Sequence, residues 1–146
     1  MKEILVQAQR LVEKKWVNGV EFHVAVSPFL FPERLECEYL EDDGCLRIAF
    51  KYLDAGFEDA ENQTDADGML TMKIGKATGR ILSVNIHVDR HDVDEVRMRV
   101  VDELNELPQT LLERSATLDP ALQRNFQIAE EVLRQNLDEI RTAVCV

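Results

Sequence analysis

The stretch Gly68–Val88 reads GMLTMKIGKATGRILSVNIHV and carries the clearest structural signal in the chain. Apolar and polar residues alternate on both sides of a glycine-containing turn, which is typical of two strands that each have one dry and one wet face. A three-residue loop, Ala77–Gly79, would place Gly79 in the left-handed conformation that such loops require. We therefore predict an antiparallel hairpin. Its register pairs Ile74 with Leu82, Met72 with Val84 and Leu70 with Ile86.

Three further segments upstream have the same two-residue period. Val20–Val26 predicts a strand, which Ser27 and Pro28 end. Segments 34–40 and 46–52 predict a hairpin whose turn contains Asp43 and Gly44, because both residue types tolerate positive φ. On the wet face of this hairpin, acidic residues of the first strand are expected to oppose basic residues of the second. These residues are Glu36, Glu38, Arg47 and Lys51.

Helical periodicity occurs at the start of the chain and again at its end. Residues 3–16 show a broad apolar stripe that predicts a helix, with Asn18 and Gly19 as its C-terminal cap. Residues 92–107 predict a second helix, which Pro108 should end. The last helix is expected from Asp119, its N-cap, to Val144, with Pro120 in the first turn.

Together these elements predict the fold class α+β. We expect a single domain over residues 1–146, with an antiparallel sheet of about five strands. The N-terminal helix and the two C-terminal helices should pack on one face of the sheet. A last helix of about 25 residues would be longer than the strands, so part of its apolar stripe would overhang the sheet. A second subunit is the simplest cover for that surplus, which predicts a homodimer. The expected dimer contacts are Leu133, Leu137, Ile140 and Val144.

Charge is the strongest compositional feature. The net charge of −11 argues against binding to a nucleic-acid backbone or to an anionic membrane surface, because both require a basic surface. Six of the acidic residues and no basic residue lie between Asp54 and Asp67, so we expect an acidic flexible loop at 54–68. The chain starts without an unbroken apolar run and has three cysteines, an odd number for a disulfide framework. A cytoplasmic protein with reduced thiols is the simplest expectation.

Motifs that carry chemistry are weak in this sequence. The histidines and carboxylates between His87 and Asp94 form the most suggestive group, with His87, Asp89 and His91 as weak candidate metal ligands. The nearby carboxylates are also suited to capping the following helix, so we expect no metal site there. No serine lies beside a histidine, and no phosphate-binding or calcium-binding loop is complete. The sequence therefore predicts no catalytic residues and no cofactor.

Two functional hypotheses of different classes remain. Large apolar residues lie between Pro28 and Pro32 in an expected loop, either as a lid over the core or as an exposed contact surface. The first hypothesis is a non-catalytic interaction module, homodimeric, that recognises a protein partner through apolar surface near the helices. The alternative is a small-molecule binding protein or enzyme with a pocket between the sheet and the helices. The candidate ligand or partner contacts are Trp16, Phe29, Leu30, Phe31 and Tyr52.

Overall fold

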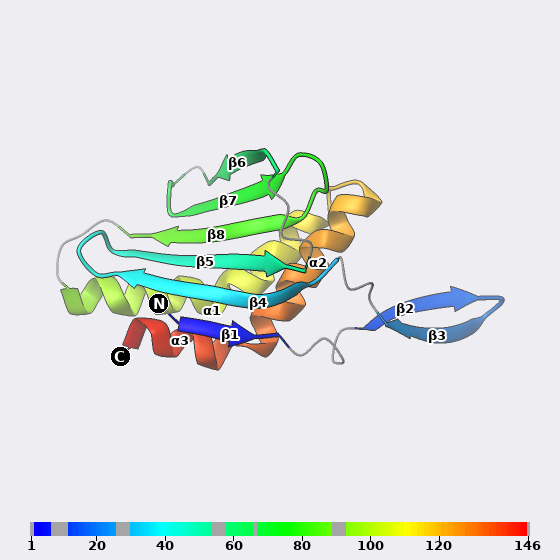
Figure 1. Cartoon of the computed structure of the whole chain (residues 1–146), viewed down its shortest axis with the longest axis horizontal. Helices are drawn as coiled ribbons and strands as arrows, with labels where there is room; N and C mark the ends of the chain where they lie inside the picture. Colours follow the sequence, from blue (N-terminus) through cyan, green and yellow to red (C-terminus); the bar gives the residue numbers. More distant parts are fainter. Residues whose placement is uncertain are drawn as a thin grey trace.

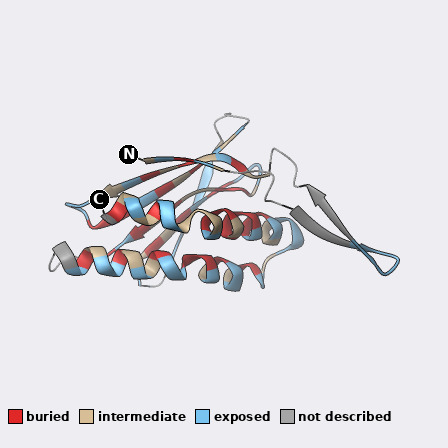
Figure 2. Cartoon of the chain, turned by 90° about the horizontal axis from the view of Figure 1, so that it is seen from below, coloured by how far each residue is buried: buried red, intermediate tan, exposed pale blue. Residues whose placement is uncertain are grey.

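The computed structural model describes residues 2–6, 12–25, 30–53, 58–65, 67–88 and 93–145. Within these residues the α+β class is confirmed, with a six-stranded antiparallel sheet followed by three helices (Figure 1). The helices cover one face of the sheet, and a separate two-stranded hairpin stands outside this body (Figures 1 and 2). The sheet contains β1 (Lys2–Leu5), β4 (Pro32–Leu40), β5 (Cys45–Tyr52), β6 (Ala60–Thr64), β7 (Leu70–Gly75) and β8 (Ile81–His87).

The predicted hairpin at 68–88 forms β7 and β8, inside a sheet with the strand order β1-β4-β5-β8-β7-β6. Two of its three predicted pairs are confirmed, since Leu70 lies opposite Ile86 and Met72 opposite Val84. Ile74 lies opposite Ile81 instead of Leu82, because the register shifts at an irregularity between Lys73 and Ile74. Gly79 has the predicted positive φ, 71°.

The hairpin of β4 and β5 is also confirmed, and Gly44 in its turn has a φ of 60°. Glu38 lies opposite Arg47, as the charge pattern predicts. Glu36 lies opposite Ala49 instead, and its carboxylate is 3.6 Å from the Lys51 ammonium along a diagonal. These charged residues alternate with buried ones along β4 and β5, so they lie on the face of the sheet that the helices leave open.

The predicted N-terminal helix is wrong. Lys2–Leu5 form the edge strand β1, and Val12–Val17 form β2 of the separate hairpin. The apolar residues of this segment have only a weak helical period, and pairing with the edge of β4 outweighs it. This pairing buries Ile4 beside Leu35 and gives the backbone of β1 hydrogen-bond partners. Residues 7–11, where the rest of the helix was predicted, lie outside the described residues.

Helix α1 (Val93–Ser115) runs through Pro108, so the prediction that this proline ends the helix is wrong. An internal proline costs a helix roughly 3 kcal/mol, because it removes a backbone donor and its ring clashes with the preceding turn. The helix continues because its apolar stripe continues: Leu104, Leu107 and Leu111 are all buried in the core, on both sides of the proline.

The last predicted helix is divided into α2 (Pro120–Gln135) and α3 (Leu137–Cys145), with Asn136 between them. Its predicted start is confirmed, since the Asp119 carboxylate accepts hydrogen bonds from the backbone N–H groups of Ala121 and Leu122, both at 3.1 Å. The break lets α3 contact β1 and β4, whereas α2 contacts β8. The three helices and the sheet therefore share one core.

This break removes the surplus apolar stripe from which the dimer contacts were predicted. Leu133, Ile140 and Val144 are fully buried in the core of their own chain, and Leu137 is partly buried against it. These side chains are therefore not an exposed dimer surface. The sheet has six strands instead of the predicted five, and the last helix is divided instead of straight, so the apolar stripe stays over the sheet of its own chain. The homodimer itself stays a prediction.

The acidic segment 54–68 is not a loop throughout. Ala60–Thr64 form β6, an edge strand that pairs with β7 and is exposed along its whole length. Residues 54–57 and 66 lie outside the described residues, and the flexibility of the segment stays a prediction.

Candidate functional site

The candidate contact residues are brought together only in part: Phe31 precedes Pro32, the register partner of Tyr52, whereas Trp16 lies on a different sheet. Trp16 lies on the separate hairpin and is exposed, whereas Tyr52 lies at the end of β5 and is packed under an arginine. Leu30 and Phe31 are partly buried against the core, as expected of a lid. Phe29 lies outside the described residues. The pocket of the second hypothesis stays a prediction.

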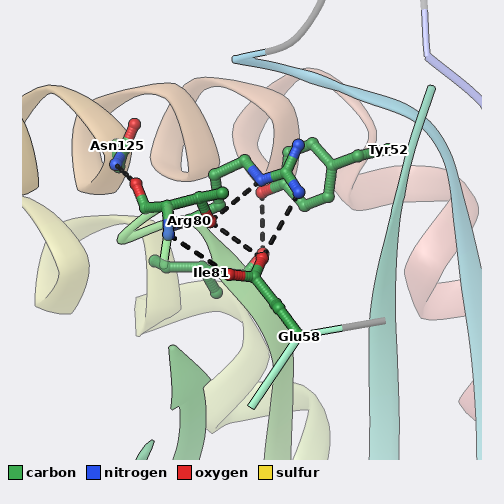
Figure 3. A network of polar contacts seen from close by, with 6 residues as sticks. Tyr52, Glu58, Arg80, Ile81 and Asn125 are labelled. Atoms are coloured by element: carbon green, nitrogen blue, oxygen red, sulfur yellow. Dashed lines mark hydrogen bonds and ion pairs between the residues drawn. The ribbon is translucent and has the colours of Figure 1, made fainter. Parts of the chain in front are cut away.

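An extensive polar cluster surrounds Arg80, a residue that no sequence pattern predicts to be part of a site. Arg80 follows the β7–β8 turn and is buried, with its guanidinium 4.3 Å from the centre of the Tyr52 ring. One of its nitrogens, Nη2, lies 3.3 Å from Oε1 of Glu58, and this ion pair is largely shielded from solvent (Figure 3). The Tyr52 hydroxyl donates to the backbone oxygen of Ile81 at 2.7 Å. A cation is thus held between an aromatic face and a carboxylate.

Glu58 is bound by several donors from the β7–β8 turn. Its carboxylate accepts hydrogen bonds from the Thr78 hydroxyl at 2.8 Å and from the Thr78 backbone N–H at 3.2 Å, in addition to Arg80. Desolvation alone would raise the pKa of Glu58, but the bonds from Thr78 and Arg80 outweigh it and lower this pKa. Gly75 makes room for this arrangement, because a Cβ there would lie 2.4 Å from the Glu58 carboxyl carbon.

The cluster also reaches helix α2. Asn125, which is buried, donates from Nδ2 to the backbone oxygen of Thr78 at 3.3 Å (Figure 3). Burial raises the pKa of Tyr52, so its hydroxyl stays protonated and keeps its bond to Ile81. The Arg80 cluster therefore joins β5, the acidic segment, the β7–β8 turn and α2, and its groups are engaged with one another. This is the chemistry of a structural clamp.

The candidate metal ligands are not brought together in the described part of the chain. His87 is exposed at the end of β8, and Asp89 and His91 lie outside the described residues. Among the residues that the structure describes, no group of three or more His, Cys, Asp or Glu side chains could hold a metal ion. The thiol of Cys37 is free and buried, and desolvation raises its pKa to about 12, so it is a poor nucleophile.

The separate hairpin, which we call the arm, consists of β2 (Val12–Val17) and β3 (Val20–Ala25). Its turn residues, Asn18 and Gly19, have φ values of 50° and 78°, as a two-residue type I′ turn requires. The prediction that this Asn-Gly pair caps a helix is therefore wrong. The signal that could have identified the arm was present: Asn-Gly between two runs of strand-forming residues is a strong hairpin signal.

Exposed apolar side chains are concentrated at the tip of the arm. Trp16 is 68% exposed, Val17 53% and Val20 54%. The other exposed large apolar residues of the described chain lie on β1, after β5 and on α1, namely Leu5, Leu53, Met98 and Leu112. A two-stranded ribbon has no core of its own and is marginally stable in isolation. The tip of the arm is therefore the candidate interaction surface.

Comparison with known proteins gives no identity to this surface. The chain matches no protein-family model, and no curated protein and no solved structure matches it. Within the described residues, none of the helices has the length and hydropathy needed to cross a bilayer.

Proposed function

We propose that the protein is a non-catalytic interaction module whose arm provides the recognition surface for a protein partner. The observation that carries this proposal is the exposure of Trp16, Val17 and Val20 at the tip of an element that stands outside the body (Figure 1). Tryptophan is enriched among residues that dominate binding energy at protein interfaces. Exposure of an apolar tip costs solubility and is explained if a partner covers it.

Charge supports a protein partner over the other macromolecules. The four charged residues in segment 12–25 other than histidine are Glu13, Lys14, Lys15 and Glu21, which balance one another, while the whole chain has a net charge of −11. A phosphate backbone or an anionic lipid surface would be repelled by the body and not attracted by the arm. A neutral, apolar tip instead suits an apolar patch on another protein.

The proposal is tested by retention of partners from an extract of the source cells on immobilised protein. Trp16→Ser should lose the retained protein, because the largest apolar contact is removed. Met98→Ser is the matched control, since Met98 on α1 is also 68% exposed. A protein retained equally by wild type, Trp16→Ser and Met98→Ser would contradict the arm as recognition surface.

A further inference from the structure

Strand β6 forms one edge of the six-stranded sheet, and no strand pairs with its outer side in the part of the chain that the structure describes (Figure 1). At one end, the backbone oxygen of Asp59 accepts a hydrogen bond from the Lys76 N–H at 2.8 Å. At the other end, the Asp65 N–H donates to the backbone oxygen of Leu70 at 2.9 Å. Because bonding direction alternates along a strand, every second residue between Asp59 and Asp65 directs its N–H and C=O groups outward. These residues, which we call the β6 edge, are Ala60, Asn62 and Thr64.

This strand is fixed at both ends although it buries none of its side chains. All five residues of β6 are exposed. Two residues before the strand, the Glu58 carboxylate is bound by Thr78 and Arg80. Directly after the strand, Asp65 forms an ion pair with Arg114 on α1. Apolar burial therefore does not explain the order of β6. The polar contacts hold its backbone extended in advance, so that pairing with a further strand costs little ordering entropy.

The surroundings of the β6 edge are acidic. The β6–β7 hairpin, residues 58–76, contains five acidic residues and two basic ones. Asp59 and Glu61 are exposed and lie two residues apart, so they share one face of the strand. Beyond the end of β6, burial raises the pKa of Glu103 on α1, and the carboxylates of Glu106 and Asp67 raise it further. A strand that pairs here therefore meets a negative potential.

This charge disfavours a second copy of β6 as the occupant of the edge. Antiparallel pairing of two copies centred on Asn62 would use every outward residue, but it sets Asp59 of each copy opposite Asp65 of the other. Pairing centred on Glu61 sets the two Glu61 residues opposite each other. Pairing centred on Gln63 sets Glu61 opposite Asp65. Like charges directly opposite each other destabilise a sheet, so the edge suits a strand of opposite charge.

We infer that the β6 edge binds an extended segment of another protein as an added antiparallel strand, with Lys or Arg at alternate positions of that segment. The outward backbone groups bond to the added strand, and the carboxylates set the charge that it must carry. A basic residue opposite Glu61 lies in a non-hydrogen-bonded pair, in which facing side chains come closest. A second basic residue two positions along the segment lies opposite Asp59. This inference goes beyond the proposed function, because β6 and the arm belong to different sheets.

Fluorescence anisotropy with a labelled synthetic peptide of alternating Lys and Thr residues tests the pairing. The peptide should bind wild type, and less tightly as added salt screens the charges. Asn62→Pro should weaken binding by about tenfold or more, because it removes an N–H at the outer edge and leaves the bonds to β7 intact. Asn62→Ala is the matched control and should bind like wild type, since its backbone keeps that N–H.

A charge variant tests the same site without a change to the backbone. Glu61→Lys should lose most of the binding, because it places a basic side chain opposite a basic residue of the peptide. Glu139→Lys on α3 makes the same change of charge away from β6 and should bind nearly like wild type. A peptide of alternating Lys and Pro carries the same charge but cannot continue a strand, so it should bind far less.

Several results would overturn the inference. They are a wild type that does not bind the Lys-Thr peptide, equal binding of the Lys-Thr and Lys-Pro peptides, and Asn62→Pro and Glu61→Lys variants that bind like wild type. A wild type that dimerises in sedimentation, and loses the dimer through Asn62→Pro, would assign the edge to a second copy instead. Trp16→Ser should leave peptide binding unchanged. Failure of the peptide experiment would therefore refute the β6 edge and leave the proposed function of the arm standing.

Discussion

The hairpin β7–β8 and the arm β2–β3 are locally alike and differ in almost everything around them. Each joins two short strands through a turn in which glycine has positive φ. β8 pairs with β5, β7 pairs with β6, and both α1 and α2 contact β8. The arm has no further strand beside it in the described residues. Most apolar residues of the first hairpin, such as Met72, Val84 and Ile86, belong to the core, whereas those at the tip of the second are exposed. The neighbours of a hairpin, and not its own sequence, decide whether its apolar residues are buried or exposed.

The largest expected effect comes from making the same kind of truncation in both hairpins. Ile86→Ala on β8 should lower the free energy of unfolding by about 2–5 kcal/mol, because Ile86 is fully buried and its truncation leaves a cavity. Val20→Ala at the tip of the arm should change it by less than about 0.5 kcal/mol. Urea denaturation followed by circular dichroism measures both. Equal losses would show that the arm is packed as part of the core.

The second effect concerns the clamp that holds the β7–β8 turn. Glu58→Gln should lower the free energy of unfolding by about 1.5–3 kcal/mol at neutral pH, because Arg80 stays buried and loses its ion-pair partner. Glu61→Gln on the exposed edge strand β6 is the control and should change stability by less than about 0.5 kcal/mol.

The difference in stability between wild type and Glu58→Gln should decrease as the pH falls. The folded-state pKa of Glu58 is lowered, so its contribution is fully present above the unfolded-state value of about 4.3. It is lost as the pH falls from that value through the folded-state pKa, where wild type also becomes protonated. The stabilities of wild type and Glu58→Gln should therefore converge in acid, as thermal unfolding at several pH values would show. A gap that widened on acidification would contradict the role of the Glu58 carboxylate.

The sequence predicts elements well where local pattern and tertiary environment agree. The hairpins at 34–52 and 68–88 have alternating faces and turn residues with positive φ, and both are confirmed. The Asp119 cap is confirmed for the same reason, since a side chain that binds the next turn needs no distant partner.

The errors occur where distant contacts decide. Pro108 should end a helix, but the burial of Leu111 beyond it maintains the helix. Ile4 fits a helical stripe, but the edge of β4 makes it a strand residue. The Arg80 cluster could not be anticipated, because Tyr52, Glu58 and Asn125 meet only in the folded chain. The arm could have been recognised from Asn18 and Gly19, but not its lack of a neighbour.

The smallest expected effect separates the two turns themselves. Gly79→Ala must accommodate both a φ of +71° and a Cβ 2.9 Å from the Leu122 side chain, so it should cost about 1–3 kcal/mol of global stability. At Gly19 the φ is similar, +78°, but nothing lies within 4 Å of an added Cβ. Gly19→Ala should therefore cost only the strain of a left-handed backbone, about 1 kcal/mol. That cost falls on the arm alone. The urea midpoint should therefore shift for Gly79→Ala and stay constant for Gly19→Ala, while amide exchange in β2 and β3 becomes faster only for Gly19→Ala. A shift of the global midpoint by Gly19→Ala would show that the arm folds cooperatively with the body.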